Sequence, residues 1–192
     1  MGMCMGLCAV SDATIQRLHA DPPLVWRVLA PDDDEPYTAA RQAGRGWLER
    51  LFGRSVPDPA PVDPAQGDVD LDKSWHGIHY LLTGTAWAGE PPLNFLAGAG
   101  QTVGNVDVGY GPARSFSSDE VAAIHAALAP VTRDSLRARF DSDAMAKLDI
   151  YPAIWRDEGD GAFDYCADYF DELKAFIADA SARGLGLLIH TS

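Results

Sequence analysis

Cysteine is scarce in this sequence, with only Cys4, Cys8 and Cys166 among 192 residues. The number is odd and no Cys-x-x-Cys pair occurs, so neither a disulfide framework nor a cysteine-ligated metal is expected. The opening residues MGMCMGLCAV also lack the positive segment of a secretory signal. We therefore expect reduced thiols that behave as small hydrophobic side chains in a cytoplasmic protein.

Positively charged residues are also few. Lys and Arg together number 15 against 28 Asp and Glu, which gives a formal net charge of −13 at pH 7. Nucleic acid is not an expected partner, because phosphate binding depends on clustered Lys and Arg. No stretch reaches the ~18 consecutive apolar residues that span a membrane, so no membrane association is expected either. The partners that remain possible are another protein and a small molecule.

Sequence motifs with a specific chemistry are absent too. The chain has no GxSxG nucleophile elbow, no GxxxxGKS/T phosphate loop and no GxGxxG dinucleotide fingerprint. We therefore predict no cofactor, and the sequence identifies no catalytic residue.

The residues that are present, 47% of them apolar, predict one folded domain over residues 1–192. Helical spacing of apolar side chains predicts helices over about residues 71–84, 118–129 and 163–184, with shorter ones near 37–52, 132–140 and 142–148. The capping-box spacing of Ser117 and Glu120 marks the start of the second of these helices.

Strands are predicted at residues 3–10, at 102–108 and in the C-terminal segment LGLLIHTS. In the first strand, alternation places Cys4, Gly6 and Cys8 on one face and Met3, Met5, Leu7 and Ala9 on the other. Two terminal strands separated by helices predict an α+β fold. We expect a small, mostly antiparallel sheet that includes the N- and C-terminal strands and is packed with several helices.

Prolines at positions 57, 59, 61 and 64 predict an extended loop over about residues 53–67. A surface loop is the favoured interpretation, and a segment read by a polyproline-binding partner is the alternative.

Four segments, in order along the chain, resemble the bacterial YfbM-like family. They are MGM at the start, LDKSWHGIHYLLTG, the glycine-rich stretch into VGYGPARSF, and DIYPAIW. The resemblance spans nearly the whole chain and implies a single α+β domain. Because the family is a domain of unknown function, the resemblance implies no catalytic residue.

One candidate site lies on the helix predicted over residues 71–84. Asp72, His76 and His79 fall within one narrow stripe of that helix, beside its apolar face. Carboxylate and neutral imidazole are ligands that a divalent metal accepts, which makes the three a weak candidate for a metal triad. The favoured interpretation is structural: polar side chains near a helix start that bond to the backbone of a facing loop.

A second candidate precedes the helix that begins near Ser118. Arg114, together with the amides at that helix start, could hold a carboxylate or a phosphate. The favoured alternative is that Arg114 bonds loop carbonyls or an internal acid such as Asp107.

Two hypotheses for function follow. The leading one is a non-enzymatic binding or interaction protein, of which immunity-like neutralisation of a partner protein is one version. The alternative is a small-molecule-binding domain or enzyme with a polar and aromatic pocket, lined by Trp75, His76, His79, Tyr110, Arg114, Tyr151 and Trp155.

Overall fold

The computed structural model describes residues 2–43 and 61–192 of the chain. The helix predicted over residues 37–52 and the loop predicted over 53–67 both extend into residues 44–60, which lie outside the described part. No helix within the described residues is long and apolar enough to cross a membrane.

One antiparallel sheet organises the molecule, with the strand order β2-β1-β5-β4-β3. The first and last strands of the chain are neighbours at its centre, paired from Met5 opposite Thr191 to Val10 opposite Gly186. This confirms the predicted α+β fold with both terminal strands in the sheet. The strands are β1 (Met5–Val10), β2 (Asp68–Asp70), β3 (Gln101–Asp107), β4 (Pro112–Phe116) and β5 (Gly186–Thr191).

Alternation along β1 divides the interior into two cores. Leu7, with its neighbours two residues away, belongs to the larger core on one face of the sheet. Cys8 and Val10 belong to the smaller core on the opposite face. The predicted separation of Cys8 from Leu7 is thus confirmed, and each face of the sheet carries its own layer of helices.

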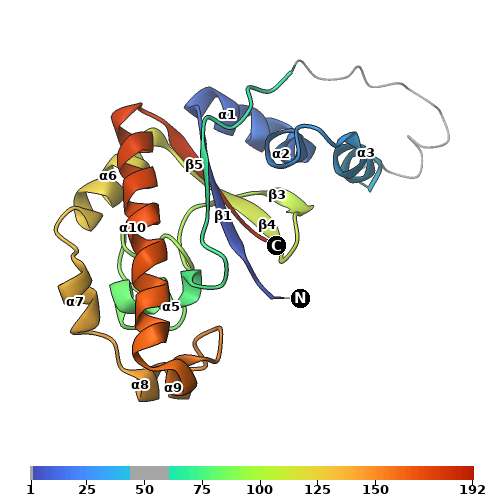
Figure 1. Ribbon diagram of the computed structural model, residues 1–192. Helices are drawn as coiled ribbons and strands as arrows, with labels where there is room; N and C mark the ends of the chain where they lie inside the picture. The colour runs from blue at the N-terminus through green and yellow to red at the C-terminus, as the bar shows by residue number, and fades with distance from the viewer. Residues whose placement is uncertain (1, 44–60) are drawn as a thin grey trace.

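The larger core lies under the layer of helices on one side of the sheet (Figure 1). Its longest helix, α10, packs against both α5 and α6. The predicted capping box is present at the start of α6, where Ser117 and Glu120 bond reciprocally to each other's backbone N–H. The layer consists of α5 (Trp75–Thr83), α6 (Ser118–Leu128), α7 (Arg133–Arg137), α8 (Ser142–Lys147), α9 (Trp155–Glu158) and α10 (Asp160–Ala182).

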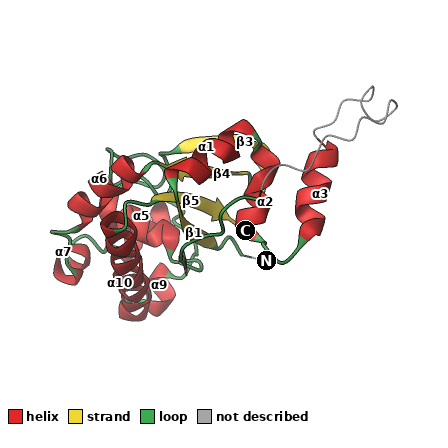
Figure 2. Ribbon diagram, turned by 90° about the horizontal axis from the view of Figure 1, so that it is seen from above, coloured by secondary structure: helices red, strands yellow, loops and turns green. Residues whose placement is uncertain are grey.

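The smaller core lies between the other face of the sheet and the N-terminal helices, which Figure 2 shows on the side away from α10. Ile15, Leu18 and Val28 from these helices share this core with Leu188 of β5. This layer consists of α1 (Asp12–Ala20), the short 3₁₀ helix η1 (Pro22–Leu24), α2 (Val25–Leu29) and α3 (Asp34–Ala43).

The starts of α5, α3 and α10 differ from the sequence prediction, and α10 begins at Asp160 where Phe163 was expected. α5 begins at Trp75 and not at Leu71, because Asp72 has a left-handed backbone with φ 46° that a helix cannot contain. α3 begins at Asp34 inside the acidic segment, since Pro36 in a first helical turn loses no hydrogen bond. The end of α5 is as predicted, at Gly84 with φ 74°.

At Gly77, α5 has no room for a side chain against the elements packed on it. A Cβ atom there would lie 2.5 Å from the Trp155 ring and 2.6 Å from the Cys166 sulfur. Both neighbours are fully buried, at 1% and 0% exposure. The absent side chain of Gly77 therefore sets how closely α5 and α10 can pack.

We predict that Gly77→Ala destabilises the fold by about 1–3 kcal/mol, because the added methyl overpacks a core that has no room for it. Gly161→Ala in α10 is the matched control, since nothing lies within 4 Å of its added Cβ. That control should leave stability unchanged or raise it by up to about 1 kcal/mol through its better helix propensity. Urea unfolding of both variants measures the difference, and equal stability would contradict the packing argument.

Candidate functional site

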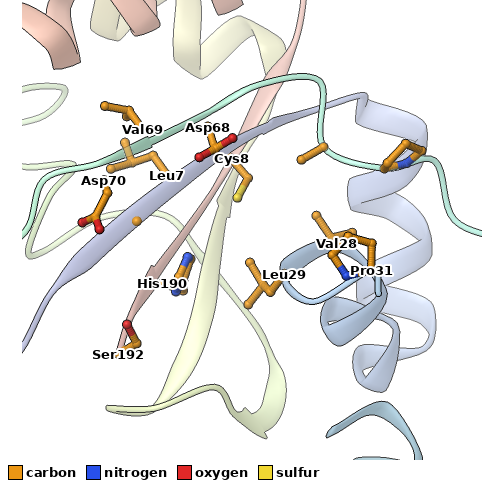
Figure 3. A pocket seen from close by; sticks show the side chains of 13 residues that line it. Leu7, Cys8, Val28, Leu29, Pro31, Asp68, Val69, Asp70, His190 and Ser192 are labelled. Atoms are coloured by element: carbon orange, nitrogen blue, oxygen red, sulfur yellow. The ribbon is translucent and has the colours of Figure 1, made fainter. Parts of the chain in front are cut away.

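A cleft lies on the smaller-core face of the sheet, between β1, β2 and β5 on one side and the end of α2 on the other (Figure 3). Its volume is about 450 Å³. Val28, Leu29 and Pro31 form an apolar wall, and Asp68, Asp70 and His190 form a polar wall across from it.

His190 has room in this polar wall because Gly6, opposite it, has no side chain. The two residues are directly opposite each other in the central strand pair. A Cβ atom on Gly6 would lie 2.4 Å from Nε2 of His190, so the imidazole ring lies over the backbone of β1 where any other residue would push it away. Among the described residues, the ring makes no hydrogen bond.

The charges around the cleft are negative. Asp70 and Asp68 lie opposite Gly6 and Cys8 in the register of β1 and β2, which places both carboxylates on the cleft face. Burial lowers the pKa of His190, and the negative charge of Asp70 offsets part of that effect. His190 is therefore neutral at pH 7 and has a ring nitrogen that can accept a proton or a hydrogen bond.

Cys8 also lines the cleft, but its thiol is not a nucleophile at neutral pH. Burial, reinforced by the negative charge of Asp68, raises the pKa of the Cys8 thiol to about 11. The thiolate that would act as a nucleophile is thus a negligible fraction at neutral pH. In the part of the chain that the structure describes, no three His, Cys, Asp or Glu side chains are arranged to hold a metal ion.

A Ser–His pair elsewhere resembles a catalytic dyad, with Ser115 Oγ 2.8 Å from Nε2 of His19. Ser115 is only 2% exposed and its hydroxyl also contacts the Gln101 carbonyl oxygen at 3.3 Å. A substrate carbonyl cannot reach such a hydroxyl, so the pair holds α1 onto β4 and is not a catalytic site.

The seven residues that the sequence predicts to line a pocket lie in several separate parts of the structure. Trp75, His76 and Tyr151 do meet: the Trp75 ring stacks on His76 with centroids 4.9 Å apart, and the Tyr151 N–H donates to Nδ1 of His76 at 3.0 Å. Nε2 of His76 lies 2.7 Å from the Ala86 carbonyl oxygen. Both ring nitrogens of His76 are therefore used to join two loops to α5, which leaves neither for a ligand.

His79 lies one turn further along α5 and is completely buried. Neither of its ring nitrogens has a hydrogen-bond partner among the described residues. Burial lowers the pKa of His79 to about 4, and the positive charges of His76 and Arg114 act in the same direction. The Ala88 backbone is near enough to offset part of this shift, but its geometry falls short of a hydrogen bond.

The other predicted residues lie elsewhere. Arg114 donates to the carbonyl oxygens of Phe95 at 2.9 Å, Leu96 at 2.6 Å and Ala99, so it binds loop carbonyls, which was the favoured alternative. Tyr110 is 55% exposed beside the end of β5. Trp155 is buried, and with Tyr151 it borders a separate cleft of about 350 Å³. The seven residues do not line one pocket.

Asp72 is separated from the two histidines because it precedes α5. Its carboxylate accepts a hydrogen bond from the Tyr165 hydroxyl at 2.8 Å and contacts the Cys4 sulfur at 3.3 Å. Those bonds, the first above all, lower the pKa of the Asp72 carboxyl. Asp72, His76 and His79 therefore form no metal triad in this fold.

Comparison with known proteins identifies the family. A domain of unknown function (DUF1877) matches residues 1–190. The chain belongs to this family. Its structure is similar to the crystal structure of a protein of unknown function, YfbM from Escherichia coli, with a TM-score of 0.63 and 18% sequence identity over 98% of this chain and 99% of that one. No curated protein matches the chain.

For this DUF1877 member, the cleft residues were the ones that sequence reasoning missed. The sequence places Gly6 on one face of the first strand but gives no reason to group it with Asp68, Asp70 and His190. One signal was available: Asp68 and Asp70 alternate around Val69, as in a strand with one charged face. The pairing that brings residue 190 over residue 6 has no local signature.

We predict that two matched substitutions in α5 differ in their effect on stability. His76→Phe removes two hydrogen bonds and leaves the Tyr151 N–H and the Ala86 carbonyl unpaired, at a cost of about 1–3 kcal/mol. His79→Phe removes two nitrogens that have no partner, so stability at pH 7 should stay within about 1 kcal/mol of the unaltered protein. Urea unfolding compares them; an equally large loss for both would contradict the assigned bonding.

We also predict that the fold loses stability in mild acid. The pKa values of His76, His79 and His190 are all lowered below the ordinary 6.5 by burial. The unfolded chain therefore binds more protons, and stability is complete above about pH 6.5 and falls as the pH approaches 4. His79, with a pKa of about 4, contributes up to about 3 kcal/mol of this loss.

Urea unfolding at pH 7, 5.5 and 4.5 measures how steeply the free energy of unfolding falls with pH. His79→Phe should flatten this slope, because the variant has no imidazole to protonate at that position. The same slope in the variant and the unaltered protein would contradict the role given to His79.

Proposed function

We propose that this protein is a non-enzymatic binding domain that holds a positively charged group, such as a guanidinium or an ammonium, in the cleft between β2 and the end of α2. The observation that carries the proposal is the placement of His190 over Gly6, near the Asp70 carboxylate, in a cleft that Asp68 also lines and that has an apolar wall on its other side.

The charges and the shape of the cleft both favour a cation with an alkyl stem. Among the described residues that line it, Asp68 and Asp70 are charged and no Lys or Arg occurs. A cation there gains charge-assisted hydrogen bonds to a carboxylate and one to the neutral imidazole. Its alkyl stem can lie on Val28, Leu29 and Pro31, as the stems of Arg and Lys do on apolar surfaces.

Binding is favoured over catalysis because no group in the cleft is activated. The thiol of Cys8 stays protonated, and the described residues that line the cleft include no Lys or Arg that could stabilise a developing negative charge beside His190. A general base alone, without a nucleophile or an electrophile, does not define a reaction. The alternative pocket lined by Trp75, His76 and their neighbours has no free ring nitrogen at His76, which argues against it.

The proposal includes a bacterial cytoplasmic setting and a protein or small-molecule partner. Cys8 and Cys166 are buried thiols that no partner cysteine approaches among the described residues, and such thiols persist in reducing compartments. Immunity-like binding of a basic protein is one version of this function.

We predict that N-acetyl-arginine amide binds the cleft and that Asp70→Asn weakens its affinity at least about tenfold, through loss of one charge-assisted bond. Asp164→Asn, which removes an exposed carboxylate from α10 on the other side of the sheet, is the matched control and should leave affinity unchanged. A ¹H–¹⁵N NMR titration at moderate salt gives both the affinity and the location.

Gly6→Ala separates the shape of the cleft from its charge. The variant keeps every charged group but displaces His190, so it should also weaken binding at least about tenfold. Chemical-shift changes that are unsaturable, or that are the same in all variants, would reject the cleft as the site.

A further inference from the structure

β2 is an edge strand, and no other strand in the described part of the chain pairs with its outer edge. Along β1, the Ala9 N–H bonds to the Gly67 carbonyl oxygen and the Leu71 N–H to the Met5 carbonyl oxygen, each within 2.9 Å. Because the direction of backbone groups alternates along a strand, those of Asp68 and Asp70 point away from β1. Among the described residues, none bonds to these outward N–H and carbonyl groups.

The side chains of the same two residues point into the cleft. Both are exposed and lie opposite Gly6 and Cys8 in the strand register, and Figure 3 shows them on the strand across from Leu29 and Pro31. A strand added beside β2 would have its own side chains on this face at every second position, directly opposite the two carboxylates.

We propose that β2 receives an extended segment of a partner protein with Arg or Lys at two alternate positions, which adds to the sheet as a sixth strand. This inference rests on the proposed function, because the cationic group in the cleft is then one of the two basic side chains. The backbone of the segment bonds to Asp68 and Asp70, and its basic side chains pair with their carboxylates.

Charge decides between this occupant and a second copy of the same chain. If two β2 strands paired with each other, aspartates would face aspartates, and like charges directly opposite destabilise a strand pair. The short, acidic edge thus resists self-association while it accepts a basic strand. A free small cation would satisfy the carboxylates but not the outward backbone groups, which only another strand can pair as a row.

The test uses two peptides of identical composition, acetyl-TVRVRVT-amide and acetyl-TVVRRVT-amide. In the first, both arginines lie on one face of an extended chain; in the second they lie on opposite faces. We expect the first to bind at least about tenfold more tightly by calorimetry, and to slow hydrogen exchange of the Asp68 and Asp70 amides.

A third peptide isolates the contribution of the backbone. This peptide is acetyl-TVRVRVT-amide with a methyl group on the backbone nitrogen of each arginine. It keeps the charge but lacks the backbone N–H donors that face β2, so its affinity should fall at least about tenfold. The double variant Asp68→Asn/Asp70→Asn should remove the preference for alternate arginines, whereas Asp164→Asn should retain it.

The outcomes separate the two proposals. Equal affinity of all three peptides overturns strand addition; if N-acetyl-arginine amide still binds in the cleft, the proposed function stands. Failure of the peptides and of the arginine amide overturns both.

Discussion

The antiparallel pairing of β1 with β5 is the constraint on which the rest of the structure depends. It brings the two ends of the chain together at the centre of the sheet, and its register decides which residues face each core. A shift of β1 by one residue would exchange the faces of Leu7 and Cys8, and the same shift of β5 instead would turn His190 into the larger core. The register is held because Leu187 and Ile189 on one face, and Leu188 on the other, are almost fully buried.

That pairing also makes the cleft. Most positions along the two central strands carry apolar side chains, but at one crossing a glycine faces a histidine, and the ring occupies the space that a side chain would fill. Because β2 pairs with β1 at the edge, Asp70 lies near this imidazole and Asp68 lies beside Cys8. The cleft is therefore a consequence of strand register and not of a loop.

Most of the fold could be predicted from the sequence, because its signals are local. The capping box at Ser117, the left-handed Gly84 and the apolar alternation of residues 3–10 each depend on neighbours in the chain. Two short strands, β2 and β4, were not predicted, since three to five residues with few apolar side chains give little periodicity. Asp72 was misplaced on a helix because its left-handed backbone is held by Tyr165, 93 residues away.

The candidate site was harder to predict for the same reason. His76 and His79 attract attention in sequence because they are close together, yet the first is used to join loops and the second has no partner. For Arg114, the favoured interpretation gave loop carbonyls or Asp107 as partners, and the structure shows that it donates to loop carbonyls. The groups that form the cleft come from positions 6, 68–70 and 190, and only tertiary contact unites them.

A crystal structure of the protein with N-acetyl-arginine amide tests the central claim most directly. The account predicts the guanidinium in the cleft, within hydrogen-bond distance of the Asp70 carboxylate and with its stem against Leu29. A cation found only at carboxylates elsewhere on the surface, with His190 and Asp70 uncontacted, would contradict it.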